Sequence, residues 1–338
     1  MNTTLRAQAE TIVTASIHAV LPDEAVRRAL QGFAPAGRVF LAAAGKAAWQ
    51  MAHAAVEVLG RPDGGVVITK YGHVKGEIPG VTCYEAAHPV PDEAGFVATE
   101  KALALVHGLT AQDAVLFLLS GGGSALLEKP LIPGAELQDI TAQLLACGAD
   151  IVEINTIRKR LSAVKGGRFA RHCAPAHVFA VILSDIVGDP VDMIASGPVS
   201  PDSSTCADAL AAAEKYALRL SDTARRLLAQ ETPKTADNVT VRVTGSVREL
   251  CAAMGARCGR VFRRVDRGVD MSSVFVRREG GFTTPAAAVA LLVVCGLLFA
   301  TMRGFVIGTR AGEIQYVADA GALAADNAVA EFVTAGQV

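Results

Sequence analysis

The sequence predicts an α/β protein built around a buried parallel β-sheet. Three apolar runs carry no polar alternation, at Val39–Ala44, Val115–Ser120 and Val178–Leu183, and such runs are typical of strands covered on both faces. Segments with helical spacing of apolar residues lie between these strands. Alanine, valine and leucine dominate, and aromatic residues make up only 5%. A chain of 338 residues is long enough for two domains and a large core.

The charge balance and the cysteines restrict the class of protein. A formal net charge of −1 argues against a nucleic-acid or membrane-surface partner. The seven cysteines are scattered and form no CxxC spacing, which favours reduced thiols in a cytoplasm over a zinc site. The first residues lack a basic start followed by an apolar run, so no signal peptide is expected.

The first elements place a lysine at a strand–helix junction. Residues 3–33 have helical spacing that Pro22 interrupts, and Asp23 is a candidate cap for the second helix. Strand Val39–Ala44 then leads through Gly45 to Lys46. The segment is not a P-loop, because the earlier glycine and the Ser/Thr after the lysine are both missing. Lys46 either contacts an anion as a point charge or is a solvated surface lysine.

Two histidines follow the next predicted strands. Gly65–Lys70 leads to His73, and Val81–Ala86 leads to His88. Ligands of open parallel sheets bind at the carboxyl ends of strands, so both histidines are candidate binding residues. A structural or merely exposed histidine is the alternative for each. Their spacing does not suit a metal.

A run of glycines follows the third apolar strand. The strand breaks at Ser120 into Gly121, Gly122 and Gly123, and Ser124 begins an apolar helix. Glycines let backbone N–H groups approach a ligand closely, and a helix start favours negative charge. The loop is therefore predicted to bind a phosphate or carboxylate. A tight turn without a ligand is the alternative.

A basic stretch follows a helix predicted at Gly134–Asp150. Asn155 precedes four cations, and paired glycines close the stretch. A polyanion site and a solvated charged face both explain this composition. The four cations are Arg158, Lys159, Arg160 and Lys165.

Two carboxylates follow strand Val178–Leu183. Asp185 and Asp189 stand at its carboxyl end, where they suit Mg²⁺, which favours a few hard oxygens together with water and phosphate. Capping of the next helix is the alternative for Asp185.

The second half of the chain contains a predicted boundary. Asp208–Ala229 reads as one helix, and the polar residues 231–238 are a candidate linker. A strand at Val239–Val243 and a helix at Val247–Met254 follow.

Six segments in one order resemble the class II glycerate kinases, a two-domain family whose members are often called hydroxypyruvate reductases. The resemblance covers roughly residues 1–250. The segments are Gly45–Ala48, Thr69–His73, Ala87–Asp92, Leu119–Leu126, Asn155–Gly167 and Ser184–Pro198.

The resemblance implies a Rossmann-like, doubly wound N-terminal domain at residues 1–238. A smaller, atypical α/β domain at 239–338 would follow, with the active site in the cleft between them. The implied reaction is the phosphorylation of D-glycerate to 2-phosphoglycerate by ATP with Mg²⁺. A reductase fits poorly, because no GxGxxG opens a helix after a strand.

Carried over position by position, the resemblance assigns three kinds of site residue. Lys46, Asp189 and Arg158 would be catalytic. Asp185 and Asp189 would hold the metal. The expected substrate- and nucleotide-binding residues are Ser120, Gly121, Gly122, Gly123, Ser124, Asn155, Lys165, His73 and His88.

Beyond Gly255 the sequence departs from the family. The family's Gly-Gly-Arg-Asn-x-Glu and Gly-Thr-Asp-Gly-x-x-Asp segments are absent, and Ala286–Met302 carries no charge. A frameshifted or divergent region, a remodelled domain and a membrane anchor remain open, the anchor being the least favoured. An impaired homologue that binds a small hydroxy acid or nucleotide is therefore the alternative function, and a hydroxypyruvate reductase a lesser one. An uncovered cleft face would also favour self-association into a homo-oligomer.

Overall fold

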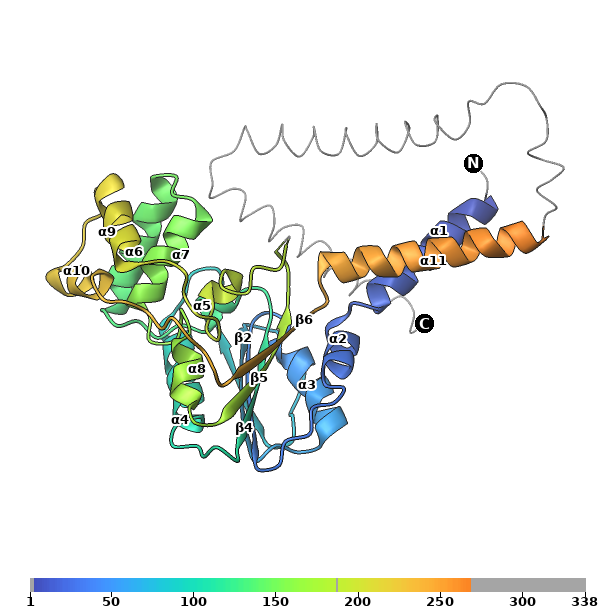
Figure 1. Ribbon diagram of the computed structural model, residues 1–338, viewed down its shortest axis with the longest axis horizontal. Coiled ribbons are helices and arrows are strands. Elements are labelled where there is room, and N and C mark those ends of the chain that lie inside the picture. Colours follow the sequence, from blue (N-terminus) through green and yellow to red (C-terminus); the bar gives the residue numbers. More distant parts are fainter. Residues whose placement is uncertain (1–2, 187, 269–338) are drawn as a thin grey trace, which may run out of the picture. The chain divides into compact units, whose positions relative to one another are not determined.

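The computed structural model describes residues 3–186 and 188–268, and its centre is a six-stranded parallel sheet (Figure 1). The strand order is β3-β2-β1-β4-β5-β6, with every neighbouring pair parallel. This order and the helices beside it confirm the predicted α/β fold. The strands are β1 Val39–Ala44, β2 Gly64–Lys70, β3 Val81–Ala86, β4 Ala114–Leu119, β5 His177–Leu183 and β6 Val239–Thr244.

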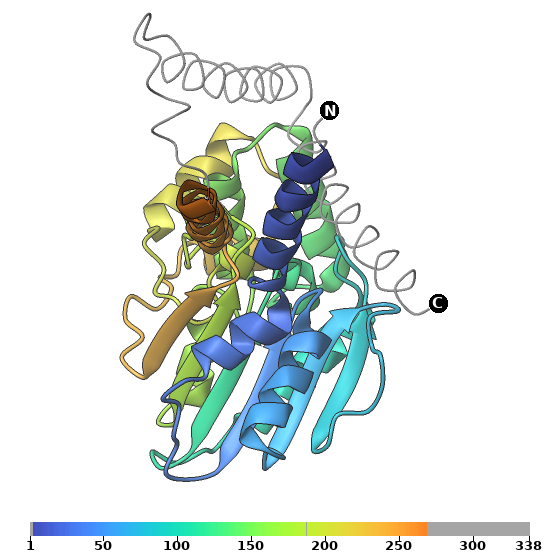
Figure 2. The same cartoon turned by 90° about the vertical axis from the view of Figure 1, so that its right-hand side faces the viewer.

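Helices cover both faces of the sheet, as the doubly wound expectation requires. Helices α2 and α3 pack on one face, against alternate residues such as Leu116 and Leu118 of β4. Helices α4, α5 and α8 pack on the other, against Phe117 and Leu119. Figure 2 shows the sheet from the side of α2 and α3. The described helices are α1 Thr3–His18, α2 Pro22–Ala29, α3 Ala48–Leu59, α4 Glu93–Leu105, α5 Gly123–Leu126, α6 Gly134–Ala146, α7 Ile151–Leu161, α8 Arg168–Cys173, α9 Cys206–Lys215, α10 Asp222–Leu228 and α11 Val247–Gly268, with a short 3₁₀ turn at Ile194–Ser196.

The break predicted at Pro22 is confirmed, but the predicted cap is wrong. Helix α2 starts at Pro22, and its N-cap residue is Leu21, which makes no side-chain cap. Proline suits the first helical position because its φ is already helical and it lacks the N–H that would stay unpaired there. Asp23 therefore lies inside the first turn, where its negative charge is still favourable.

The single helix predicted at Asp208–Ala229 is wrong, because the chain forms α9 and α10 there. Ala217 has a φ of 47°, in the left-handed region, which ends α9. Ser221 then caps α10 by accepting a hydrogen bond from the Ala224 N–H. The helix predicted to run to Asp150 also ends early, at Ala146.

The sheet continues past the expected domain boundary at residue 238. Strand β6 pairs with β5 along its whole length, so residues 239–244 belong to this sheet. The segment 231–238 is attached to the sheet and to the loop before α9, because the Val178 N–H of β5 donates to the Asn238 carbonyl at 2.8 Å and the buried Thr232 hydroxyl donates to Asp202 Oδ2 at 2.7 Å. Most of the expected C-terminal domain, with the apolar run 286–302, lies outside the described residues, so that domain stays a prediction.

Within residues 3–186 and 188–268, no helix is both long and apolar enough to cross a bilayer.

Candidate active site

The site lies where the strand order reverses, between β1 and β4. The loops after these strands are joined backbone to backbone, because Lys46 N–H donates to the Gly121 carbonyl at 2.8 Å. The Ala47 N–H donates to Ser120 Oγ at 3.0 Å, so the Ser120 hydroxyl holds the start of α3. In open α/β sheets this reversal opens a crevice at the carboxyl ends of the strands, where ligands bind.

Two glycines are required by the close approach of these loops. Gly45 has a φ of +125°, and a Cβ there would lie 2.2 Å from Ser120 Oγ. A Cβ on Gly121 would lie 2.3 Å from Asp185 Oδ2. No real Cβ contact is that short, so glycine is what lets Ser120 and Asp185 reach the loop.

Lys46 and His88 lie against the next glycine, and His73 contacts the backbone of Lys46. A Cβ on Gly122 would lie 3.1 Å from Lys46 Cγ and 3.2 Å from His88 Nε2. His73 Nδ1 lies 3.0 Å from the Lys46 carbonyl oxygen. Because a carbonyl only accepts, His73 Nδ1 carries the proton of this hydrogen bond. The structure thus brings residues from four strand ends together around Lys46 and Gly122.

The glycine loop presents unpaired backbone donors. In the described part of the chain, the N–H groups of Gly121 and Gly122 donate to no protein acceptor. Helix α5 after the loop has only four residues, Gly123–Leu126, so it adds little dipole. The backbone geometry suits an anion, and most of the compensating charge must come from side chains.

Arg158 and Lys165 donate hydrogen bonds to backbone carbonyl groups of the glycine loop and of the residues directly after it. Lys165 Nζ donates to the Ser124 carbonyl at 2.8 Å and to the Leu127 carbonyl at 3.1 Å. Arg158 Nη2 donates to the same Ser124 carbonyl at 3.1 Å. Burial lowers the pKa of Lys165 to about 8, against the opposite effect of the nearby Glu128 carboxylate. Burial also lowers the pKa of Arg158.

Asn155 supports the loop after β5. Its Oδ1 accepts a hydrogen bond of 2.7 Å from Ser196 Oγ, and both side chains are buried. Asp189, Ala195 and Ser196 have φ of 55°, 52° and 61°, a conformation that costs a non-glycine residue about 1–3 kcal/mol. Ala195 packs closely against Gly123, because a Cβ added to Gly123 would lie 2.9 Å from the Ala195 Cβ. Such strain concentrates at functional sites.

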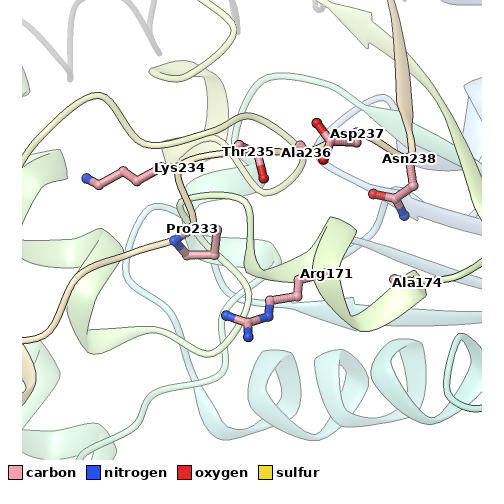
Figure 3. A pocket seen from close by; sticks show the side chains of 8 residues that line it. All are labelled: Arg171, Ala174, Pro233, Lys234, Thr235, Ala236, Asp237 and Asn238. Carbon is pink, nitrogen blue, oxygen red and sulfur yellow. The ribbon is translucent and has the colours of Figure 1, made fainter.

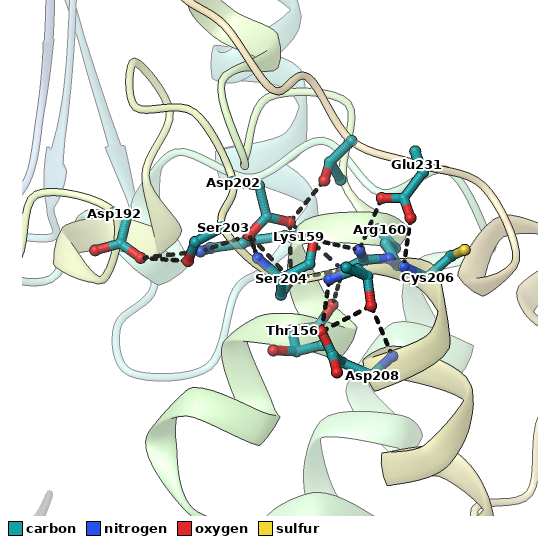
Figure 4. A network of polar contacts seen from close by, with 12 residues as sticks. Thr156, Lys159, Arg160, Asp192, Asp202, Ser203, Ser204, Cys206, Asp208 and Glu231 are labelled. Carbon is teal, nitrogen blue, oxygen red and sulfur yellow. Dashed lines mark hydrogen bonds and ion pairs between the residues drawn. The ribbon is translucent and has the colours of Figure 1, made fainter.

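Two of the four cations of the basic stretch form a structural network instead (Figure 4). Lys159 Nζ donates to Asp202 Oδ1 at 3.0 Å, and the fully buried Arg160 lies 3.4 Å from Asp202 Oδ2. Burial alone would raise the pKa of Asp202, but the Thr232 hydroxyl and Lys159 lower it overall. These two cations are neither solvated nor available to a ligand.

The two predicted metal ligands follow β5. Asp185 is exposed and Asp189 is half-buried, so both carboxylates are accessible. Among the described residues, no group of three or more His, Cys, Asp or Glu side chains forms a ready-made metal site. Two carboxylate groups still suit Mg²⁺, which completes its shell with water and substrate phosphate.

A groove of about 390 Å³ lies away from this site (Figure 3). It lies at the amino ends of β5 and β6, since Ala174 and Asn238 each precede one of these strands. None of the predicted site residues lines it. The lining residues are Arg171, Ala174, Pro233, Lys234, Thr235, Ala236, Asp237 and Asn238.

Sequence reasoning missed several residues that shape the site. Glu128, Asp202 and Ser196 were not singled out, yet all three are buried polar residues that contact site segments. A charged residue directly after the apolar run Ala125–Leu127 was the only sequence signal for Glu128.

Comparison with known proteins gives consistent matches. A family model described as a domain of unknown function, DUF4147, matches residues 8–229. The D-glycerate 2-kinase of Thermotoga maritima is 53% identical over 243 residues, which cover 71% of this chain and 58% of that protein. A putative hydroxypyruvate reductase of Agrobacterium vitis is 43% identical over 227 residues, 64% of this chain and 50% of that protein.

A solved structure agrees with these matches. The crystal structure of a glycerate kinase from Thermotoga maritima has a TM-score of 0.74 and 50% identity, covering 76% of this chain and 63% of that chain. The chain therefore spans less than two thirds of the length of each of these relatives.

Proposed function

The chain belongs to the DUF4147 family and to the class II glycerate kinases, and from that premise we propose that it phosphorylates D-glycerate to 2-phosphoglycerate with ATP. The observation that carries the proposal is the convergence of Lys46, His88 and Asp185 on Gly121 and Gly122 at the switch point of the sheet. Phosphoryl transfer needs positioning and neutralisation of negative charge, and this edge offers unpaired N–H groups, a lysine and carboxylates.

In the proposed reaction the 2-hydroxyl oxygen of glycerate forms a bond to the γ-phosphorus of ATP. The bond from that phosphorus to the ADP oxygen breaks, and ADP leaves with its electron pair. The Asp189 carboxylate accepts the hydroxyl proton. Lys46 orients an anionic group, and the N–H groups of Gly121 and Gly122 bind phosphate or carboxylate oxygens.

Asp185 would hold Mg²⁺ together with phosphate oxygens, and Asp189 would either join it on the metal or serve as the proton acceptor, since both are accessible hard oxygen donors. When bound, the ion would neutralise charge on the phosphate groups. Ser120, His73, Ser124 and Asn155 would shape the site around the substrates, through the contacts described above.

The location and partners are part of the same proposal. The five described cysteines are all free thiols, which supports a cytoplasmic location. Self-association stays a prediction that no observation tests.

The test is ADP release by the full chain with Mg-ATP and D-glycerate. We expect turnover, and Lys46→Met to lower kcat/KM at least 100-fold, because a phosphate or carboxylate loses its point charge. Lys101→Met, on the exposed side of α4, is the matched control. Phosphorus NMR identifies the product, because a 2-phosphate couples to one proton and a 3-phosphate to two.

Other outcomes separate the remaining functions. Binding of ATP or glycerate by a folded chain without ADP release would favour the non-catalytic homologue. Oxidation of NADH with hydroxypyruvate, without ADP release, would favour the reductase named among the relatives. Unchanged turnover in Lys46→Met would remove that lysine from the site.

A further inference from the structure

Two buried charged side chains, Lys165 and Glu128, and the half-buried Arg158 lie behind the glycine loop. Arg158 and Lys165 both donate to the Ser124 carbonyl, and Lys165 also donates to the Leu127 carbonyl. The side chains of Lys165 and Glu128 are fully buried, with Lys165 Nζ 3.4 Å from Glu128 Oε2. Two cations thus bind the carbonyls of Ser124, within α5, and of Leu127, directly after it.

The Ser124 carbonyl accepts these donors because the helix does not use it. In a continuing α-helix the N–H of Glu128 would donate to it. That N–H donates instead to Thr99 Oγ1 at 3.1 Å, and helix α5 ends after Leu126. A four-residue helix is not stable on its own, so its position depends on such tertiary contacts.

The Glu128 side chain has no hydrogen bond that explains its burial. Among the described residues, neither of its carboxylate oxygens has a hydrogen-bond partner, and the Arg158 Nε is also unpartnered. Burying a carboxylate in this way is costly, and its evident compensation is the charge of Lys165. With two cations and one carboxylate, the group carries one excess positive charge, and burial protects that charge from screening.

We propose that Arg158, Lys165 and Glu128 are positioning residues that hold the Gly121–Ser124 loop in an anion-binding conformation and set the positive charge behind it. The identity of the anion, phosphate or carboxylate, rests on the proposed function. The positioning role rests on the contacts to Ser124 and Leu127. Lys165 and Arg158 act on the ligand through the loop rather than by touching it.

Two substitutions that should change anion binding in opposite directions test the role of the positive charge behind the loop. Calorimetric titration of the full chain at pH 6.5 would use inorganic tripolyphosphate as the phosphate probe and D-glycerate as the carboxylate probe. Lys165→Met removes a cation and both donated hydrogen bonds, so at least one probe should bind at least tenfold more weakly. Glu128→Gln keeps the shape and removes the negative charge, so the same probe should bind two- to fivefold more tightly, although both variants are less stable.

A purely structural role predicts weaker binding in both variants, and that result would overturn the proposal. Unchanged binding in both, or a wild-type chain that binds neither probe, would also overturn it. Lys165→Gln, which keeps a donor without the charge, replaces Lys165→Met if the latter does not fold, and should also weaken binding. Lys129→Met is the matched control, since the half-exposed Lys129 pairs with Glu100 at the surface, and its binding should stay within twofold.

The same experiment separates this inference from the proposed function. Opposite shifts in a chain that does not phosphorylate glycerate support the positioning role and contradict the kinase. Turnover of glycerate in a chain whose two variants shift the same way supports the kinase and contradicts the positioning role.

Discussion

The buried ammonium group of Lys165 makes stability depend on pH. Its pKa is about 8 in the folded chain against an ordinary 10.5, because burial disfavours the charged form. Between these values the unfolded chain binds more protons than the folded chain, so stability rises with pH. The wild type should gain on the order of 2–3 kcal/mol relative to Lys165→Met from pH 7.5 to pH 10.5.

Urea unfolding of both chains across this pH range measures the gain. Titration of the groups that do not contact Lys165 cancels in the difference between the two proteins. A difference in free energy of unfolding that stays constant from pH 7.5 to pH 10.5 would mean that Lys165 is not buried as described.

Gly45 tests the close approach of the two loops at the switch point. Alanine there would place a Cβ 2.2 Å from Ser120 Oγ and 2.6 Å from the Ser120 carbonyl oxygen, at a φ of +125°. We expect Gly45→Ala to lower the free energy of unfolding by about 3 kcal/mol, from clash and backbone strain together.

Gly60→Ala is the control for strain without clash. Gly60 has a φ of +82°, and a Cβ there would meet no atom within 4 Å. Its loss should be about 1 kcal/mol in the same chemical unfolding experiment. Equal losses in the two variants would show that the loops after β1 and β4 do not approach as closely as described.

At the scale of elements, Asp202 joins helix α7 to two loops. It accepts hydrogen bonds from Lys159 of α7 and Thr232, and it pairs with the buried Arg160 (Figure 4). Asp202→Asn keeps the shape but leaves two buried cations with less compensating charge. The expected loss of stability is about 3–5 kcal/mol by thermal or chemical unfolding.

The control is a surface carboxylate with a similar partner. Asp139 lies 3.5 Å from Arg219, and both side chains are more than half exposed. Asp139→Asn should cost less than about 1 kcal/mol, because water screens the pair. A loss in Asp202→Asn as small as this would contradict a buried network.

At the scale of the whole described fold, β4 connects the two cores. Phe117 packs with α4, α5 and α8 on one face, and Leu118 packs with α2 and α3 on the other. Both are fully buried. Phe117→Ala should cost about 3–5 kcal/mol and Leu118→Ala about 2–5 kcal/mol, from lost burial and the cavity left behind.

Because both faces depend on one strand, each variant should unfold the whole sheet in one transition. Trp49, in α3, reports on one face by fluorescence, and far-ultraviolet circular dichroism reports on all helices. Midpoints that coincide by both probes are expected in each variant. A separate early loss of the α3 signal in Leu118→Ala alone would mean that the two cores unfold independently.

The elements that the sequence predicted well are those whose cause is local. The strands at residues 39–44, 115–120 and 178–183 followed from continuous apolar runs, and the observed bounds agree within one residue. The glycine loop followed from three adjacent glycines, and the strand-end positions of His73, His88 and Asp185 followed from the parallel sheet. The division of residues 206–228 into two helices was not predicted, because the turn at Ala217 has no glycine or proline to mark it.

The α/β class and the loops at the carboxyl ends of the strands follow from patterns along the chain. Which cations face a ligand and which are neutralised in the interior depends on how the chain folds. Lys159 and Arg160 contact Asp202, more than forty positions away, and Lys165 contacts Glu128 across the two intervening helices α6 and α7. Burial of charge depends on partners distant in sequence, because the cost of removing water is compensated only by groups that the fold brings within contact.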